Sequence, residues 1–509
     1  MQSKKLLGKF TRYRNELIIF TIAVSVRLIT WILIPIDWNW DSYHHWQISY
    51  LSLHIGFRHG RLWDLNGCEY IWGIFPHLIQ SILLFVFDTS TILPYRLFNL
   101  LSGSVNTVLV YKIGNHFYNT KIGIQSGLLF AIFPIAAIFD IIAMQDTIAI
   151  TFLLSSLYLI KDYPFWSGIL LALSGQSRVE LFLVGIIILL GYILRERVST
   201  NSQTFIIGYS VILFIFGIHL YNQTGNPIYP LSYSLYNIFG GFIPENKDIH
   251  FTVLMLRWLY WKLSVWPKKF TGIMILSAAI GMTFIVPYMA WKKWSKYQPI
   301  LYTITTLSVL SPIFLTYVGS DFENLLIMLR MINPIIALFI PLILNIIYSR
   351  LDNSPIVIKN YILYLLIIIL IGSFCFFIPH YSSFQQKAAE AYSVADKIHE
   401  HYAEGTIVSD YPTINYKLIQ KYNIYPRNII GNHYSPDYYG INDPFEYALW
   451  LDINEVTLWI YWDERAKPVW DVISKYYPEL FVLKERLPAA DIYTVDQTIL
   501  KEILENSNN

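Results

Sequence analysis

The chain has 509 residues, of which 55% are hydrophobic and only 14% are charged, with a formal net charge of +2. A typical soluble domain is about 25% charged, so this composition excludes an ordinary soluble globular protein. The near-neutral charge also gives no support to nucleic acid as a partner. Long apolar runs separated by short polar breaks predict a polytopic α-helical membrane protein. The two cysteines, Cys68 and Cys375, lie far apart and do not indicate a disulfide framework.

The first apolar segment, residues 17–36, is long enough to cross a bilayer. We interpret it as an anchor that is not cleaved, because no small-residue cleavage pattern follows it. Basic residues precede it, which favours a cytoplasmic N-terminus. They are Lys4, Lys5, Lys9, Arg12 and Arg14.

Ten further segments have the character of membrane spans. They are residues 92–113, 121–139, 146–160, 164–177, 180–194, 203–221, 270–290, 299–318, 331–348 and 361–379. Segment 70–87 is also apolar, but Pro76 and His77 interrupt it. If this segment does not cross, the basic loops between later spans all face the cytoplasm, as the positive-inside rule favours. We therefore predict eleven spans, an interfacial helix at 70–87 and an extracytoplasmic C-terminus.

This topology gathers ionisable residues near the outer membrane face. They are Asp37, Asp41, Asp140, Asp146, Arg178, Glu180, Asp321, Glu323 and Arg330. Charged groups at membrane depth are costly and usually mark a pathway or a site. For any single residue a plain role at a helix end is equally reasonable, because charged side chains there reach the interface. Their common location favours a functional site, although the assumed topology itself sorts them.

The first external loop begins with an aromatic and acidic stretch that contains Asp37 and Asp41. A helix is predicted from residue 42 to 60, since Tyr43, Trp46, Tyr50, Leu53 and Phe57 follow helical spacing on one face. Asp41 stands just before this helix, where its ordinary role would be the N-cap. That role does not exclude catalysis. Histidines in the loop follow no metal-binding spacing, so a metal site there is not favoured.

Two arginines stand at the outer ends of predicted spans. A short helix rich in small residues ends at Arg178 and Glu180, and Arg330 precedes Pro334 in a similar way. Arg178 and Glu180 could simply pair with each other and hold a broken helix. Alternatively, Arg178 or Glu180 reaches the headgroup of a donor or acceptor. Arginine suits a phosphate, because the guanidinium fork can hold two oxygens at once.

Residues 384–509 differ from the rest of the chain, because they are more charged and contain no span. Strands are predicted at 405–410, 455–461 and 480–485, and helices at 443–451 and 465–477. This alternation predicts a small extracytoplasmic α/β domain. The chain therefore divides into a membrane domain, 1–383, which includes external loop 37–91, and a soluble domain, 384–509.

Several motifs, in this order, resemble the GT-C superfamily of lipid-phosphosugar glycosyltransferases, in particular its protein mannosyltransferase and aminoarabinose transferase-like branch. The resemblance covers about residues 15–340. The motifs are Asp41-Ser-Tyr-His-His-Trp46, the Pro76 segment before Tyr95-Arg96, Phe133-Pro134 followed by Asp146-Thr147, the helix ending at Arg178-Val-Glu180, and Arg330 with Pro334.

The resemblance implies an enzyme that transfers one sugar, with mannose favoured, from a polyprenyl or dolichyl phosphate. The acceptor would be a protein, lipid or glycan, and the reaction a single inverting displacement. Asp41 would be the general base, while Arg178 and Arg330 would bind the lipid phosphate. Asp146 would orient acceptor or sugar, and Asp37 and Glu180 are further substrate-binding candidates. No metal cofactor is favoured, although Asp37 and Asp140 leave a divalent metal open.

Two other classes remain open from the sequence. A transporter or flippase also places Asp and Arg residues within broken membrane helices. Against it, the spans show no obvious internal repeat, and the polar residues lie near one face rather than at mid-membrane. A non-catalytic scaffold would leave the Asp and Arg residues unexplained. The cell membrane is favoured as the location, and the endoplasmic reticulum has the same sidedness.

Overall fold

The computed structural model describes residues 13–56, 59–62, 73–195, 200–232, 326, 329–351, 356–436 and 443–506. The predicted spans 270–290 and 299–318, together with Asp321 and Glu323, lie outside the described residues. The chain forms two compact units. We call the first the helical unit (Met1–Leu33, Tyr70–Pro76 and Arg96–Ile378) and the second the α/β unit (Ile34–Glu69, His77–Tyr95 and Pro379–Asn509).

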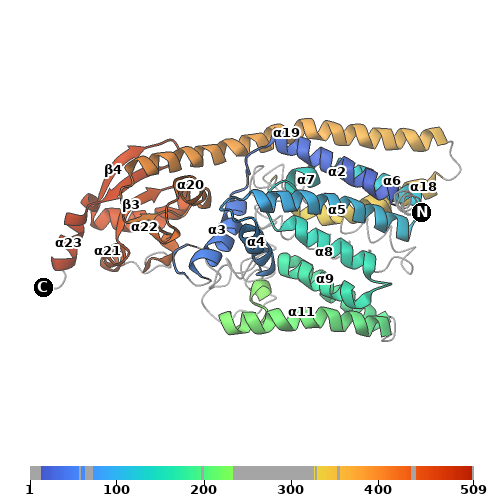
Figure 1. Ribbon diagram of the computed structural model, residues 1–509, viewed down its shortest axis with the longest axis horizontal. Helices are drawn as coiled ribbons and strands as arrows, with labels where there is room; N and C mark the ends of the chain where they lie inside the picture. Colours follow the sequence, from blue (N-terminus) through green and yellow to red (C-terminus); the bar gives the residue numbers. More distant parts are fainter. Residues whose placement is uncertain are drawn as a thin grey trace, which may run out of the picture. The chain divides into compact units, whose positions relative to one another are not determined.

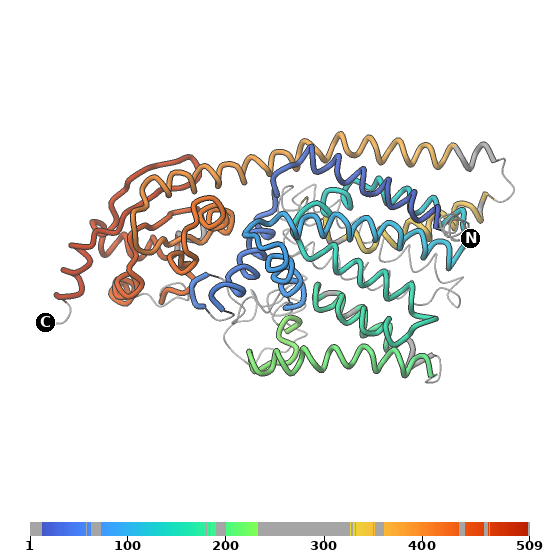
Figure 2. Tube along the Cα trace, viewed as in Figure 1, coloured from blue at the N-terminus to red at the C-terminus, as the bar shows by residue number. Residues whose placement is uncertain are grey.

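Helices account for the described part of the helical unit (Figures 1 and 2). They are α2 (Arg14–Leu33), most of α5 (Leu93–Phe117), α6 (Thr120–Ala131), α7 (Pro134–Phe139), α8 (Asp146–Leu159), α9 (Pro164–Ser177), α10 (Glu180–Arg195), α11 (Thr200–Thr224), the 3₁₀ turn η4 (Leu329–Ile332), α18 (Asn333–Arg350) and the first part of α19 (Ile356–His401). Helix α9 packs against both α8 and α11, and Figure 2 shows the three side by side in teal and green.

The crossing of α9 and α11 depends on two glycines. A methyl group on Gly168 would overlap the Phe205 carbonyl oxygen, and one on Gly208 would overlap that of Phe165. Small residues permit such close approach of helix backbones in a membrane. Around this crossing, buried side chains of α5, α8, α9, α10, α11 and α18 form one apolar core.

Three helices in the described part of the chain are long and apolar enough to cross a membrane: Arg14–Leu33, Thr200–Thr224 and Tyr361–His401. The doubtful segment 70–87 contains α4 (Phe75–Val86), a helix of 12 residues. At a rise of about 1.5 Å per residue, α4 is about 18 Å long, shorter than a bilayer core of about 30 Å. This length agrees with a segment that does not cross by itself. The full number of spans stays a prediction.

Residues 121–139, predicted as one span, form two helices, α6 and α7. Phe133 between them has φ −76° and ψ 115°, and Pro134 is the first residue of α7. A residue before proline is disfavoured in the helical conformation, which explains the break. Helix α7 then ends at Phe139, so residues 140–145 connect it to α8 without regular helix.

The α/β unit contains a five-stranded sheet in the order β2-β1-β3-β5-β4. Its strands are β1 (Thr406–Val408), β2 (Ile429–Ile430), β3 (Val456–Tyr461), β4 (Phe481–Arg486) and β5 (Asp491–Val495). β2, β1 and β3 run parallel, while β5 pairs antiparallel with both β3 and β4. The accompanying helices are α20 (Pro412–Tyr422), α21 (Pro444–Ile453), α22 (Asp463–Tyr476) and α23 (Gln497–Asn506).

The predicted strands at 405–410, 455–461 and 480–485 correspond to β1, β3 and β4, and are confirmed. The predicted helices at 443–451 and 465–477 correspond to α21 and α22, and are confirmed as well. Four further elements were not predicted from the sequence: β2, β5, α20 and α23.

Helix α3 (Trp40–Ile55) packs against α20 within the α/β unit (Figure 1). The Asn415 amide donates to Gln47 Oε1 at 3.1 Å, and the Trp46 ring meets the Tyr416 ring edge-on at 4.8 Å. The sequence analysis assigns loop 37–91 to the domain of residues 1–383. By its contacts, most of this loop groups with residues 379–509.

Candidate functional site

Asp146, Arg178 and Arg330 meet in the helical unit. Arg178 Nη1 donates a hydrogen bond to Asp146 Oδ1, and Arg330 Nε lies 3.9 Å from the same oxygen. Each of the three residues is less than 10% exposed. Asp146 is the first residue of α8, Arg178 directly follows α9, and Arg330 lies in η4 before α18. The structure thus brings together three residues that the sequence analysis selected separately.

A small pocket adjoins this cluster. It is lined by Asp146, Ala149, Ile150, Arg178, Leu181, Arg330 and Pro334. Two guanidinium groups face one carboxylate, so these three side chains together carry one net positive charge. Asp146 Oδ2 is buried and has no hydrogen-bond partner among the described residues. The cluster can therefore attract an anion and accept one further hydrogen bond.

The local chain path explains how Arg178 reaches Asp146. Arg178 leaves the helical conformation, with φ −144° and ψ 115°, while its N–H still donates to the Ser174 carbonyl. The Leu181 N–H then donates to the Arg178 carbonyl at 2.9 Å, which closes the turn into α10. Glu180 begins α10, but its side chain lies outside the described part of the structure. Its expected pairing or substrate contact stays a prediction.

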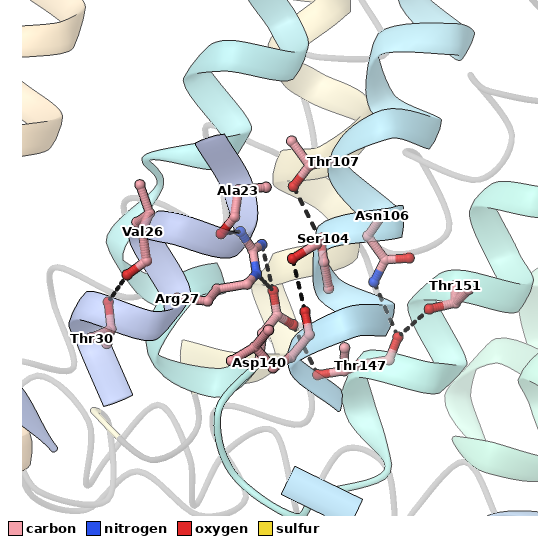
Figure 3. Close-up of polar contacts among 12 residues, drawn as sticks. Ala23, Val26, Arg27, Thr30, Ser104, Asn106, Thr107, Asp140, Thr147 and Thr151 are labelled. Carbon is pink, nitrogen blue, oxygen red and sulfur yellow. Dashed lines mark hydrogen bonds and ion pairs between the residues drawn. The ribbon is translucent and has the colours of Figure 1, made fainter. Parts of the chain in front are cut away.

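A second buried cluster joins Arg27, Asp140 and Thr147 (Figure 3). Arg27, in α2, donates from Nε and Nη2 to Asp140 Oδ2, at 2.9 and 2.6 Å. The Thr147 hydroxyl donates to Asp140 Oδ1 at 2.9 Å. The sequence analysis selected Asp140 but missed Arg27. The available signal was an arginine inside an otherwise apolar span, which is costly unless it is paired.

Side chains of α5 hold the non-helical segment 140–145. Arg96 Nε donates to the Ile141 carbonyl at 2.8 Å, and the Asn99 amide donates to the Ile142 and Met144 carbonyls at 2.7 and 2.6 Å. Residues 140–145 are buried, and buried backbone carbonyls need hydrogen-bond partners within the protein. This explains the polar residues on α5, a helix that otherwise resembles a span.

Asp37 and Asp41 belong to the α/β unit. The Asp41 N–H donates to Asn39 Oδ1 at 3.0 Å, so Asn39 is the N-cap of α3. The interpretation of Asp41 as N-cap is therefore wrong, and Asp41 lies within the first turn. Asp37 Oδ1 in turn accepts from the Asn39 N–H at 3.1 Å. Asp37 therefore holds the backbone of the capping residue Asn39.

The aromatic residues around this helix start are buried. The Tyr43 hydroxyl donates to the Asp37 carbonyl at 2.9 Å and lies 2.8 Å from the Tyr392 hydroxyl. Burial, together with Tyr392 and Asp37, raises the pKa of Tyr43 well above its ordinary value. Tyr43 therefore stays neutral and can donate this hydrogen bond throughout the physiological pH range.

His45, on α3, meets His77, on α4, with 2.9 Å between Nδ1 and Nε2. Within the described ranges, no group of three or more His, Cys, Asp or Glu residues could hold a metal ion. Both oxygens of Asp140 are engaged by Arg27 and Thr147, so this carboxylate is not available as a metal ligand without rearrangement. Independence from a metal stays a prediction.

Residues 73–221 match a family model described as dolichyl-phosphate-mannose-protein mannosyltransferase. The matched segment includes Asp146 and Arg178 but neither Asp41 nor Arg330. No curated protein shows a significant match to the chain.

Solved structures of similar fold cover almost the whole chain. ArnT from Cupriavidus metallidurans in the apo state has a TM-score of 0.52 and 12% identity, over 94% of this chain and 98% of that chain. The same protein bound to undecaprenyl phosphate has a TM-score of 0.50 and 10% identity, over the same shares. The apo oligosaccharyltransferase from Archaeoglobus fulgidus has a TM-score of 0.51 and 11% identity, over 96% and 75%. The resemblance to the GT-C superfamily is thereby confirmed as a likeness of fold.

Proposed function

We propose that this chain, which has the GT-C fold, is an integral membrane glycosyltransferase. It would transfer a single sugar from a polyprenyl or dolichyl phosphate to a hydroxyl of a protein, lipid or glycan. The reaction would take place on the extracytoplasmic face, with the cell membrane favoured. The observation that carries the proposal is the buried cluster of Arg178 and Arg330 around Asp146. Mannose is the favoured sugar, by the description of the matching family model.

The two arginines suit the phosphate of the carrier. A buried positive charge is costly unless a partner compensates it. In the cluster, two guanidinium groups lie at one carboxylate, and an arriving phosphate would accept hydrogen bonds from both of them. Negative charge increases on the phosphate as the bond to the sugar breaks, so fixed cations there stabilise the transition state.

Asp146 would have two roles through its two oxygens. Oδ1 holds Arg178 and lies near Arg330, which sets the direction of both guanidinium groups. Oδ2, buried and without a hydrogen-bond partner in the described part of the chain, would accept a hydrogen bond from a hydroxyl of sugar or acceptor. Such a hydrogen bond would orient the sugar or the acceptor, which is the role that the family resemblance implies for Asp146.

Asp41 is the proposed general base. The acceptor oxygen would attack the anomeric carbon, the bond from that carbon to the phosphate oxygen would break, and its electron pair would stay on the phosphate. The acceptor proton would pass to Asp41. This scheme requires no metal ion.

Transfer from radiolabelled polyprenyl-phosphate sugars tests the proposal. The purified protein in lipid nanodiscs would be compared with Asp41→Asn and with Asp162→Asn, a matched change at an exposed position. Loss of a general base lowers rates about 10²–10⁴-fold, so Asp41→Asn should lose transfer while Asp162→Asn keeps it. Full transfer by Asp41→Asn would refute the assignment of the base.

Two outcomes would favour the competing class of transporter or flippase. The first is a parent protein that transfers no sugar from any carrier in a panel. The second is a topology that places the candidate residues elsewhere. Reporter fusions at residues 90 and 118 test that topology, because the proposal puts the first outside and the second inside the cell.

A further inference from the structure

We infer that Arg27 and Asp140 are positioning residues for the candidate site. Their ion pair would hold the first turn of α8 through Thr147, and so aim Asp146 at Arg178 and Arg330. Neither Arg27 nor Asp140 lines the pocket beside Asp146. The inference rests on the proposed function, since it concerns the same site.

The contacts form a continuous path from α2 to α8 (Figure 3). Arg27 occupies one oxygen of Asp140 with two hydrogen bonds, at 2.9 and 2.6 Å. Thr147 occupies the other oxygen at 2.9 Å. The carboxylate of Asp140 thus joins the two helices, and its orientation is set from both sides.

Helix geometry carries the effect from Thr147 to Asp146. Neighbouring residues in an α-helix differ by about 100° around the axis, so a contact at Thr147 sets the rotation of α8. A rotation of about 20° would move a carboxylate about 5 Å from the axis by about 2 Å. Such a shift is enough to break the hydrogen bond with Arg178. A misplacement of about 1 Å can lower the rate of a reaction about 100-fold.

Helix α5 further limits the movement of Asp140 and of the start of α8. A methyl group on Gly103 would overlap the Asp140 carboxylate, so α5 lies directly against it. The Asn106 amide donates to the Thr147 carbonyl at 3.1 Å, which ties the same turn of α8 to α5. Asp140 and the start of α8 therefore have little room to shift while Arg27 stays in place.

A purely structural role is the competing explanation. A buried ion pair is weak evidence for stability, because well-packed apolar residues often serve as well. The positioning role differs in one respect. Loss of the hydrogen bond between Thr147 and Asp140 must lower activity by displacing Asp146. The test must therefore measure coupling to Asp146 and not stability alone.

Thr147→Val provides the mildest test, because it removes the hydroxyl that binds Asp140 but keeps the β-branched shape. Thr151→Val is the matched control. Its hydroxyl, one turn later on α8, donates to the Thr147 carbonyl at 2.9 Å and not to the Asp140 carboxylate. We expect Thr147→Val to lower kcat at least tenfold at a temperature where thermal unfolding shows the variant fully folded, and Thr151→Val to keep the parental kcat.

A double-mutant cycle with Asp146→Asn separates positioning from structure. If Thr147 acts through the Asp146 carboxylate, Thr147→Val will add little further loss once Asp146→Asn is present. Arg27→Met combined with Asp140→Asn should show the same non-additivity and leaves no unpaired buried charge. Independent, multiplying losses would overturn the inference, as would a Thr147→Val protein with parental kcat and KM.

The same assays keep this inference apart from the proposed function. Parental transfer together with a fully active Thr147→Val protein overturns only the positioning role. A parent that neither binds undecaprenyl phosphate nor transfers sugar overturns the proposed function, and the inference with it. Binding of undecaprenyl phosphate to each variant provides the second readout, and positioning predicts weaker binding by Thr147→Val.

Discussion

Arg178 donates a hydrogen bond to Asp146 across 32 residues of sequence, and so joins the end of α9 to the start of α8. Arg330 approaches the same carboxylate oxygen from the start of α18, at 3.9 Å. Three separate helix ends therefore contribute to one charged cluster. Because each arginine lies where a helix begins or ends, the guanidinium groups depend on the packing of the bundle and not on a single loop.

The guanidinium of Arg178 can be tested by Arg178→Lys. Lysine keeps the charge but cannot hold Asp146 and a phosphate with one planar fork. We expect the affinity for undecaprenyl phosphate to fall about tenfold, or about 1.4 kcal/mol, in a titration with the purified protein. Arg14→Lys makes the same change at an exposed residue and should leave the affinity unchanged. Equal affinity for both variants would contradict the role given to Arg178.

The close approach of α5 to Asp140 can be tested by Gly103→Ala. The added methyl group would overlap the carboxylate, so the ion pair with Arg27 must shift. Such overpacking costs about 1–3 kcal/mol, and the thermal unfolding midpoint in detergent should fall. Gly372→Ala is the control, since a methyl group there meets no atom within 4 Å. Its midpoint should stay or rise slightly, because alanine favours a helix more than glycine does.

The N-cap of α3 can be tested by Asn39→Ala. Loss of the side chain that accepts the Asp41 N–H should destabilise the first turn by about 1 kcal/mol. Faster hydrogen exchange of amides at residues 41–43 would report this loss. Asn39→Ser, which supplies another capping oxygen, should restore slow exchange. If Asn39→Ala left the exchange rates unaltered, the cap would not stabilise the turn that carries Asp41.

A buried polar network in the α/β unit can be tested by Tyr447→Phe. The Tyr447 hydroxyl donates to Asn432 Oδ1 at 2.8 Å and accepts from Trp459 Nε1 at 2.9 Å. Removing the hydroxyl deletes both bonds and leaves the Trp459 N–H only the longer one to Asn432 Oδ1, at 3.3 Å, so we expect a cost of about 1 kcal/mol. We expect a lower midpoint of chemical unfolding, followed by tryptophan fluorescence. Tyr461→Phe, on the same strand as Trp459, is the control and should change the free energy of unfolding by less than about 0.5 kcal/mol.

The local elements of the α/β unit were largely predictable, and their arrangement was not. β1, β3 and β4 follow from short apolar runs with turn residues at their ends. β2 has only two residues, Ile429 and Ile430, which is too short for any periodicity to appear. β5 lies between β3 and β4 in the sheet, although it follows both in sequence. Strand order of this kind depends on packing that no local pattern contains.

The candidate site was predictable in its residue types but not in its pairings. Arg178, Arg330 and Asp146 stand out because charges near membrane helices are rare. Arg27 carries the same signal, but its partner Asp140 is 113 residues away, and nothing local identifies it. The prediction of Asp41 as the N-cap of α3 was wrong for a different reason. Asp37, Asn39 and Asp41 are all suitable capping residues, and only the hydrogen bonds decide among them.

The packing of α3 on the last part of the chain has a consequence for biogenesis. Gln47 and Asn415, which bind each other in the folded α/β unit, are 368 residues apart in sequence. At about 5–20 residues per second, a ribosome needs about 20–70 s to synthesise the stretch between them. Helix α3, with Asp41 in its first turn, therefore cannot pack against α20 until synthesis is almost finished. Prematurely terminated chains would lack the support for Asp41, so a truncated protein should be inactive even when its membrane helices are inserted.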